Sequence, residues 1–119
     1  MRTKIVAGNW KMNNDKKESK ALIKDLKKAL KKEQLENTRV IVAPTFVNLS
    51  SSIKAAKNSK VEVVAQNMHQ AKNGAYTGEI SAQMLKAIGI KTVILGHSER
   101  RTYFNETDAS LAEKVDAVL

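Results

Sequence analysis

The stretch that decides the fold reads Arg39-Val40-Ile41-Val42-Ala43-Pro44. Its four central residues are apolar, three of them are β-branched, and Pro44 ends the run. A run of this length is typical of a strand rather than a helix. Because polar residues do not alternate with the apolar ones, it predicts a strand of a parallel sheet that is buried on both faces.

Three similar runs occur elsewhere in the chain. One precedes this stretch, at residues 4–7, and two follow it, at residues 61–66 and 92–95. Helical patterns follow each run, at residues 15–33, from Thr45 to residue 56, at residues 81–87 with Gly89 as a stop, and from Thr107 or Asp108 to Leu119. Four β-α units in series predict an α/β fold with a parallel sheet. No linker interrupts residues 1–119, so we expect a single domain.

The connections between the strands decide whether helices cover both faces of the sheet. If consecutive strands are neighbours, right-handed crossovers place every helix on one face and leave the other face bare. A flavodoxin-like sheet avoids this by reversing the strand order, and a closed eight-unit barrel avoids it by adding strands. Such a barrel takes ~250 residues, about twice the 119 residues of this chain. Either the order reverses, or the chain is a piece of something larger.

The composition excludes several classes of protein. The chain has no cysteine, which excludes disulfides, thiol catalysis and thiolate metal sites. It shows no secretory signal, and no stretch approaches the ~18 consecutive apolar residues of a membrane span. We therefore expect a cytoplasmic protein without a membrane partner.

The net charge is +9, and most of it lies in the first 35 residues, chiefly in the lysine-rich helical segment 15–33. In that segment Leu22, Leu26, Ala29 and Leu30 form an apolar stripe, and lysines cover the remaining surface. Such a basic balance can indicate a nucleic-acid-binding domain. The aromatic residues that would stack on bases are scattered, however, so a solvated helix face is the better interpretation and no nucleic-acid partner is expected.

Two predicted strand ends carry reactive side chains. Asn9 and Lys11 follow the first run, and His97 follows the fourth. In parallel α/β folds such residues lie beyond the carboxyl ends of the strands, where sites form. Strand alternation would point Asn9 and Lys11 to the same side. Lys11 suits a phosphate or an oxyanion and His97 suits carbonyl polarisation or proton transfer, although each residue alone is more often structural. His69 lies in a polar loop without an obvious partner.

Four motifs resemble those of the triosephosphate isomerases, and they occur in the family's order. The first strand leads into Gly8-Asn9-Trp10-Lys11-Met12-Asn13, and the third leads into Ala65-Gln66-Asn67. The loop that follows reads Gly74-Ala75-Tyr76-Thr77-Gly78-Glu79. The fourth run leads into Gly96-His97-Ser98-Glu99-Arg100-Arg101, and Phe104, Glu106 and Asp108 continue the match. The similarity extends from Lys4 to Leu119.

The resemblance implies the first four units, (β/α)4, of a (β/α)8 TIM barrel. It also implies exchange between dihydroxyacetone phosphate and D-glyceraldehyde 3-phosphate in glycolysis and gluconeogenesis, without a cofactor or a metal. In family terms Asn9 and Lys11 bind the triose phosphate and His97 is the electrophile. Ser98 opens the short helix after His97, and Glu99 neighbours and orients Lys11.

The resemblance also implies a homodimer. Thr77 would lie at the tip of a loop that enters the partner subunit and supports the partner's site. Glu79 and Arg100 would belong to the same dimer contact.

Three parts of the family's site have no counterpart in these 119 residues. The family's glutamate base, its lid and its phosphate loops lie on later strands, so we expect the chain alone to be a very poor catalyst. Three accounts follow. The chain is an N-terminal fragment that needs the missing C-terminal half, a non-catalytic half-barrel that self-associates through its bare sheet face, or, far behind these, a nucleic-acid-binding domain.

Overall fold

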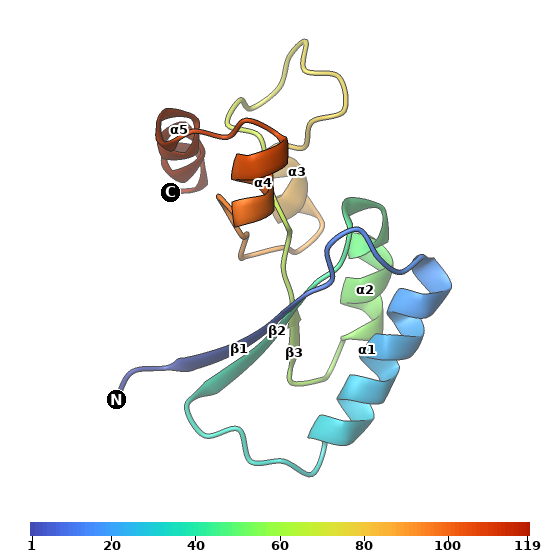
Figure 1. The fold of residues 1–119 in the computed structure, drawn as a ribbon. Helices are drawn as coiled ribbons and strands as arrows, with labels where there is room; N and C mark the ends of the chain where they lie inside the picture. Colours follow the sequence, from blue (N-terminus) through green and yellow to red (C-terminus); the bar gives the residue numbers. More distant parts are fainter. The chain divides into compact units, whose positions relative to one another are not determined.

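The computed structural model describes residues 1–119 and divides into two compact units, Met1–Gln66 and Asn67–Leu119 (Figure 1). The first, unit 1, holds all of the sheet. The second, unit 2, holds three helices and the loops that join them.

The sheet of unit 1 has three parallel strands in the order β1-β2-β3. They are β1 (Lys4–Asn9), β2 (Thr38–Ala43) and β3 (Val61–Val63). The pairing of β1 with β2 runs from Lys4 opposite Thr38 to Asn9 opposite Ala43. Consecutive strands are therefore neighbours, and the carboxyl ends of β1 and β2 lie level with each other.

Two helices join these strands: α1 (Lys16–Leu30) after β1, and α2 (Leu49–Ala55) after β2, which the short 3-10 helix η1 (Phe46–Asn48) precedes. Figure 1 shows α1 and α2 on the same side of the sheet, as right-handed crossovers require. Asp15 caps α1, because its carboxylate accepts from the Glu18 amide over 2.8 Å while the Glu18 carboxylate accepts from the Asp15 amide over 3.1 Å. This reciprocal cap explains where the predicted helix begins.

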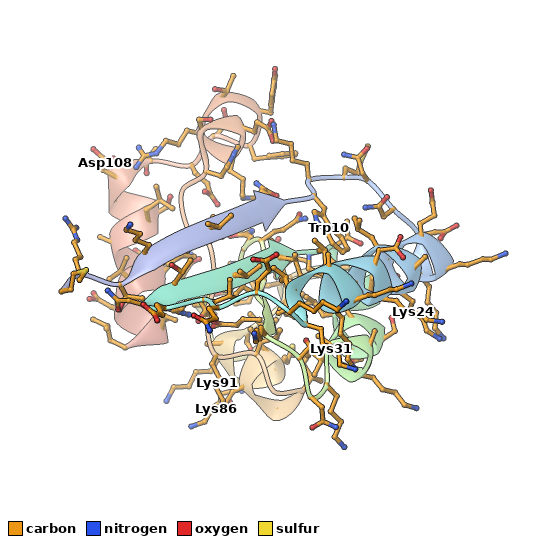
Figure 2. All side chains as sticks on the ribbon, turned by 90° about the horizontal axis from the view of Figure 1, so that it is seen from below. Trp10, Lys24, Lys31, Lys86, Lys91 and Asp108 are labelled. Atoms are coloured by element: carbon orange, nitrogen blue, oxygen red, sulfur yellow. The ribbon has the colours of Figure 1, made fainter.

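The buried face of α1 differs from the predicted stripe. Leu22 and Ala29 are exposed. The face that turns inward repeats at helical spacing and consists of Ser19, Ile23, Leu26 and Leu30. The prediction missed Ile23, which is fully buried, and named its neighbour Leu22 instead. The lysines lie on the exposed surface as expected, except Lys27, which is half-buried; Lys24 and Lys31 are labelled in Figure 2.

The predicted cap at Thr45 is wrong in detail. Thr45 does precede η1, but its side chain makes no hydrogen bond to the helix backbone. Its hydroxyl instead accepts from the side-chain amide of Asn48 over 3.1 Å. A 3-10 turn before α2 thus replaces one continuous helix.

Burial along the strands is uneven. Ile41, Val42 and Ala43 of β2 are buried, as the uninterrupted apolar run predicted. In β1, however, Ile5 is 55% exposed and Val6 is 61% exposed. The prediction of burial on both faces is therefore wrong for β1, which is the edge strand of the three.

Unit 2 contains α3 (Ala82–Ala87), α4 (Ser98–Tyr103) and α5 (Asp108–Val118). The predicted starts of α3 and α5 are confirmed, since Ser81 caps α3 and Thr107 caps α5 through their hydroxyl oxygens. Gly89 follows α3 with φ of +96°, a backbone conformation that glycine adopts without strain.

The predicted fourth strand does not form, because residues 92–95 lie outside every strand of the structure. Its apolar, β-branched composition suits a strand, but only Val93 lies in an isolated β-bridge, and a strand needs a run of paired residues, which composition does not supply. The described fold is accordingly α/β with three parallel strands, as in part of a TIM barrel. None of the helices is both long and apolar enough to cross a membrane.

Candidate functional site

The first predicted site lies where β1 ends. Asn9 is the last residue of the strand and is half-buried, whereas Lys11 is exposed. The Lys11 amide donates to the side-chain oxygen of Asn9 over 2.9 Å, which closes a tight turn of the kind that asparagine favours. The two residues are thus brought together.

Lys11 has a φ of +56°, which places its backbone in the left-handed region that non-glycine residues seldom adopt. The prediction from strand alternation does not apply, because the strand stops at Asn9 and an extended backbone does not continue to Lys11. The left-handed backbone thus coincides with a candidate binding residue, as strained backbone often does at functional sites.

Gln66 supports this turn, and sequence reasoning gave it no role. Its side-chain amide donates to the carbonyl of Lys11 over 2.8 Å and to the carbonyl of Ala43 over 2.7 Å. The one available signal was a polar, amide-bearing residue directly after the buried run that ends at Ala65.

The second predicted site lies at the start of α4 in unit 2. His97 precedes the helix, and Ser98 is its first residue, as expected. The Glu99 amide donates to Nδ1 of His97 over 3.2 Å. A ring nitrogen that accepts a hydrogen bond carries no proton, so the proton of the neutral imidazole sits on Nε2.

The Glu99 carboxylate also approaches His97, with Oε2 3.7 Å from Nδ1. That separation is too long for a hydrogen bond, and Nδ1 cannot accept from the amide and donate to the carboxylate at once. The shorter contact, with the amide, decides the tautomer. His97 therefore offers Nε2–H as a hydrogen-bond donor, which is the form that polarises a carbonyl oxygen.

Gly96 holds the backbone just before His97. Its φ is +69°, and a Cβ built on it would lie 2.9 Å from Cδ1 of Leu111, on α5. Both the conformation and the space require glycine at this position. The packing of α5 thus limits where the chain can run as it reaches His97.

A buried ionic cluster lies beside α4 and α5. Oε2 of Glu106 accepts from Nε of Arg100 over 2.8 Å and from the ammonium of Lys114, which also donates to the side-chain oxygen of Asn67 over 3.0 Å. Burial alone would raise the pKa of Glu106, but the hydrogen bonds from Arg100 and Lys114 outweigh it and hold the pKa below its ordinary value. The carboxylate therefore stays charged inside unit 2.

The motif match included Glu106 and Asn67, but sequence reasoning missed Lys114. A signal for it did exist. Lys114 lies three residues after Leu111, on the inward side of α5, where a lysine needs an acidic partner.

The loop that carries Thr77 is anchored at its base. Thr77 is exposed, and Oε2 of Glu79 lies 3.4 Å from Nδ1 of His69. The His69 ring also lies against the Tyr76 ring, with centroids 4.4 Å apart. The expectation that His69 has no partner is therefore wrong, because residues far along the loop fold back onto it.

Arg100, predicted to lie at the dimer contact with Thr77 and Glu79, has partners within unit 2. Besides its ion pair with Glu106, its guanidinium lies 4.8 Å from the centroid of the Phe104 ring. The structure brings Asn9 to Lys11 in unit 1 and His97 to Glu99 in unit 2. No group of His, Asp and Glu side chains is arranged to hold a metal ion.

The chain is similar along nearly its whole length to members of one known family. Residues 4–119 match the family model described as triosephosphate isomerase. The chain is 57% identical to the triosephosphate isomerase of Flavobacterium psychrophilum and 55% identical to that of Flavobacterium johnsoniae, covering 100% of this chain and 47% of each relative. It is 54% identical to that of Clostridium acetobutylicum, covering 98% of this chain and 46% of the relative. The chain spans about half the length of these relatives.

Proposed function

Because this chain belongs to the triosephosphate isomerase family, we propose that it contributes part of a site that interconverts dihydroxyacetone phosphate and D-glyceraldehyde 3-phosphate. The observation that carries the proposal is the hydrogen bond from the Glu99 amide to Nδ1 of His97. It leaves Nε2–H as a donor, which can stabilise the negative charge that develops on the substrate's carbonyl oxygen. The proposal includes a cytoplasmic location and a role in glycolysis and gluconeogenesis, both implied by the family resemblance.

Asn9 and Lys11 act in this proposal as substrate-binding residues. Their strand end presents an amide and an ammonium, which suit phosphate and carbonyl oxygens. Lys11 also acts in catalysis by its charge, and Glu99 orients it. No residue of this chain is proposed as the base that removes the proton from carbon.

The two units act in this proposal as one half-barrel domain, residues 1–119. Three parallel strands with helices on one side support it. Since the relatives are about twice as long, we propose that activity needs a C-terminal half like theirs. Losing a positioned base alone typically costs about 10²–10⁴-fold in rate.

A coupled isomerase assay tests the proposal. The chain is assayed alone and mixed with a separately made segment covering the other half of the Flavobacterium psychrophilum relative, and sedimentation checks that the two associate. We expect activity only in the mixture, and we expect His97→Gln to lower it by about 10²–10⁴-fold. Lys11→Met should abolish most of it, whereas Lys91→Met, at an exposed lysine in unit 2, should leave it unchanged.

Two results would reject parts of the proposal. Full activity of the chain alone would reject the claim that its base lies elsewhere. An associated mixture that lacks activity would reject the isomerase function itself.

A dimer forms the second part of the proposal, with Thr77, Glu79 and Arg100 at its contact. The exposed position of Thr77 and the anchored base of its loop support this arrangement. A competing function, a non-catalytic half-barrel that self-associates through its sheet, is favoured by the exposure of Ile5 and Val6.

Sedimentation of two variants separates these assemblies. Thr77→Arg should dissociate a dimer held by the loop, and Val6→Thr should dissociate one held by the sheet. A wild-type monomer would contradict both.

A further inference from the structure

We propose that Gln66 is a positioning residue that sets the backbone of Lys11 and, through it, the place of the ammonium. The inference rests on the proposed function only for what the ammonium does. Gln66 follows β3, and its single side-chain amide donates to the carbonyl of Lys11 after β1 and to the carbonyl of Ala43 at the end of β2. One side chain thereby joins three neighbouring strand ends.

The position of Lys11 needs such a support. A left-handed φ is unfavourable at a residue with a Cβ, so the loop around Lys11 must compensate by holding the residue from both sides. The Lys11 amide is held by Asn9 and its carbonyl by Gln66. The Asn9 contact is local, while the Gln66 contact ties the turn to a residue far along the sequence.

A second residue of the same loop is held in the same way. Asn14 has a φ of +72°, and its carbonyl accepts from the side-chain amide of Asn48 over 3.0 Å. Lys11 and Asn14 are the two residues between β1 and α1 with left-handed φ, and each has its carbonyl held by a side-chain amide from a distant element. The parallel indicates that these amides set the shape of the loop.

Variants of the Gln66 and Asn48 side-chain amides serve as controls for each other. Gln66→Glu and Asn48→Asp each replace an NH2 donor by an oxygen of nearly the same size, and Gln66→Met removes the donor without adding charge. In the ¹⁵N-labelled chain without substrate, the backbone amide resonance of Lys11 then reports on the Gln66 contact. The amide resonance of Asn14 reports on the Asn48 contact.

We expect both Gln66 variants to shift the Lys11 amide resonance and to speed its hydrogen exchange on the order of tenfold, while Asn14 stays as it is. Asn48→Asp should instead shift the Asn14 amide resonance and speed its exchange, while Lys11 stays unchanged. An unchanged Lys11 resonance in both Gln66 variants would overturn the inference, and so would equal changes at Lys11 and Asn14, which would indicate general loosening.

The two-part isomerase assay then tests the functional half of the inference. Gln66→Met should raise KM for the triose phosphate several-fold with a smaller change in kcat. Unchanged kinetics beside a disturbed Lys11 resonance would overturn that half. If the wild-type mixture is inactive, the proposed function fails, but the resonance test of Gln66 still stands because it uses no substrate.

Discussion

The ammonium of Lys114 donates to the carboxylate of Glu106 inside unit 2, where their side chains are only 7% and 5% exposed. Arg100 donates to the same carboxylate oxygen from a less buried position. Two cations therefore share one acidic group, and the stability of unit 2 depends on keeping all three charged.

Replacing Lys114 by methionine should destabilise unit 2 by about 3 kcal/mol, since removing one partner leaves a buried charge poorly compensated. The measurement is urea unfolding followed by circular dichroism. Lys91→Met, which changes an exposed lysine of the same unit, should shift the free energy of unfolding by less than about 0.5 kcal/mol. Equal effects of the two substitutions would show that the buried pair adds no stability.

Acid should weaken unit 2 through Glu106. Its pKa is lower in the folded protein than its ordinary value of 4.5, so the folded state favours the carboxylate. The resulting stabilisation is fully present above about pH 4.5 and is lost as the pH falls from there through the lower folded value. Unfolding free energies measured from pH 6 to pH 3 should fall less steeply in Glu106→Gln than in the wild type. A steeper fall in the variant would contradict the sign of the shift.

Gly96→Ala should cost about 2–4 kcal/mol, the sum of a left-handed backbone and an overfilled contact with Leu111. Gly78→Ala is the matched control, because Gly78 also has a positive φ, +92°, but a Cβ there would meet no atom within 4 Å. It should cost about 1 kcal/mol from the backbone alone. Thermal unfolding of both variants separates the two contributions, and identical losses would mean that the Leu111 contact relaxes freely.

The tautomer of His97 can be read directly by ¹⁵N resonance of the labelled imidazole. We expect the neutral ring to show a bare Nδ1 and a protonated Nε2. Glu99→Pro, which removes the amide hydrogen that Nδ1 accepts, should return the ring to a mixture of both tautomers. A proton on Nδ1 in the wild type would contradict the hydrogen bond on which the proposed electrophile rests.

Helix starts were the most predictable part of the fold. Asp15, Ser81 and Thr107 all cap helices where the sequence placed them, because a cap depends on a few neighbouring residues. The exposure of β1 and the missing strand at residues 92–95 were not predictable in the same way. Both depend on which segments lie alongside a strand, and composition does not contain that information.

In the candidate site, too, local features were predictable and contacts between distant residues were not. Motifs identified Asn9, Lys11 and His97, since their types and spacing are local. The support from Gln66 was out of reach, because it joins residues that are distant in the sequence, and so was the tautomer of His97, because a backbone amide sets it. Whether Glu99 orients Lys11 stays a prediction.

The hydrogen bonds of Asn9 and His97 have one further consequence. The side-chain oxygen of Asn9 accepts from the Lys11 amide, and the one lone pair of Nδ1 of His97 accepts from the Glu99 amide. Asn9 retains its NH2 group and neutral His97 its Nε2–H as further donors. Each residue thus keeps a donor that suits lone pairs on oxygen, whereas the acceptor nitrogen of His97 is already used. A ligand rich in phosphate and carbonyl oxygens fits that polarity, and a base that removes the ligand's proton is not supplied by Nδ1 of His97 while that nitrogen accepts from the Glu99 amide.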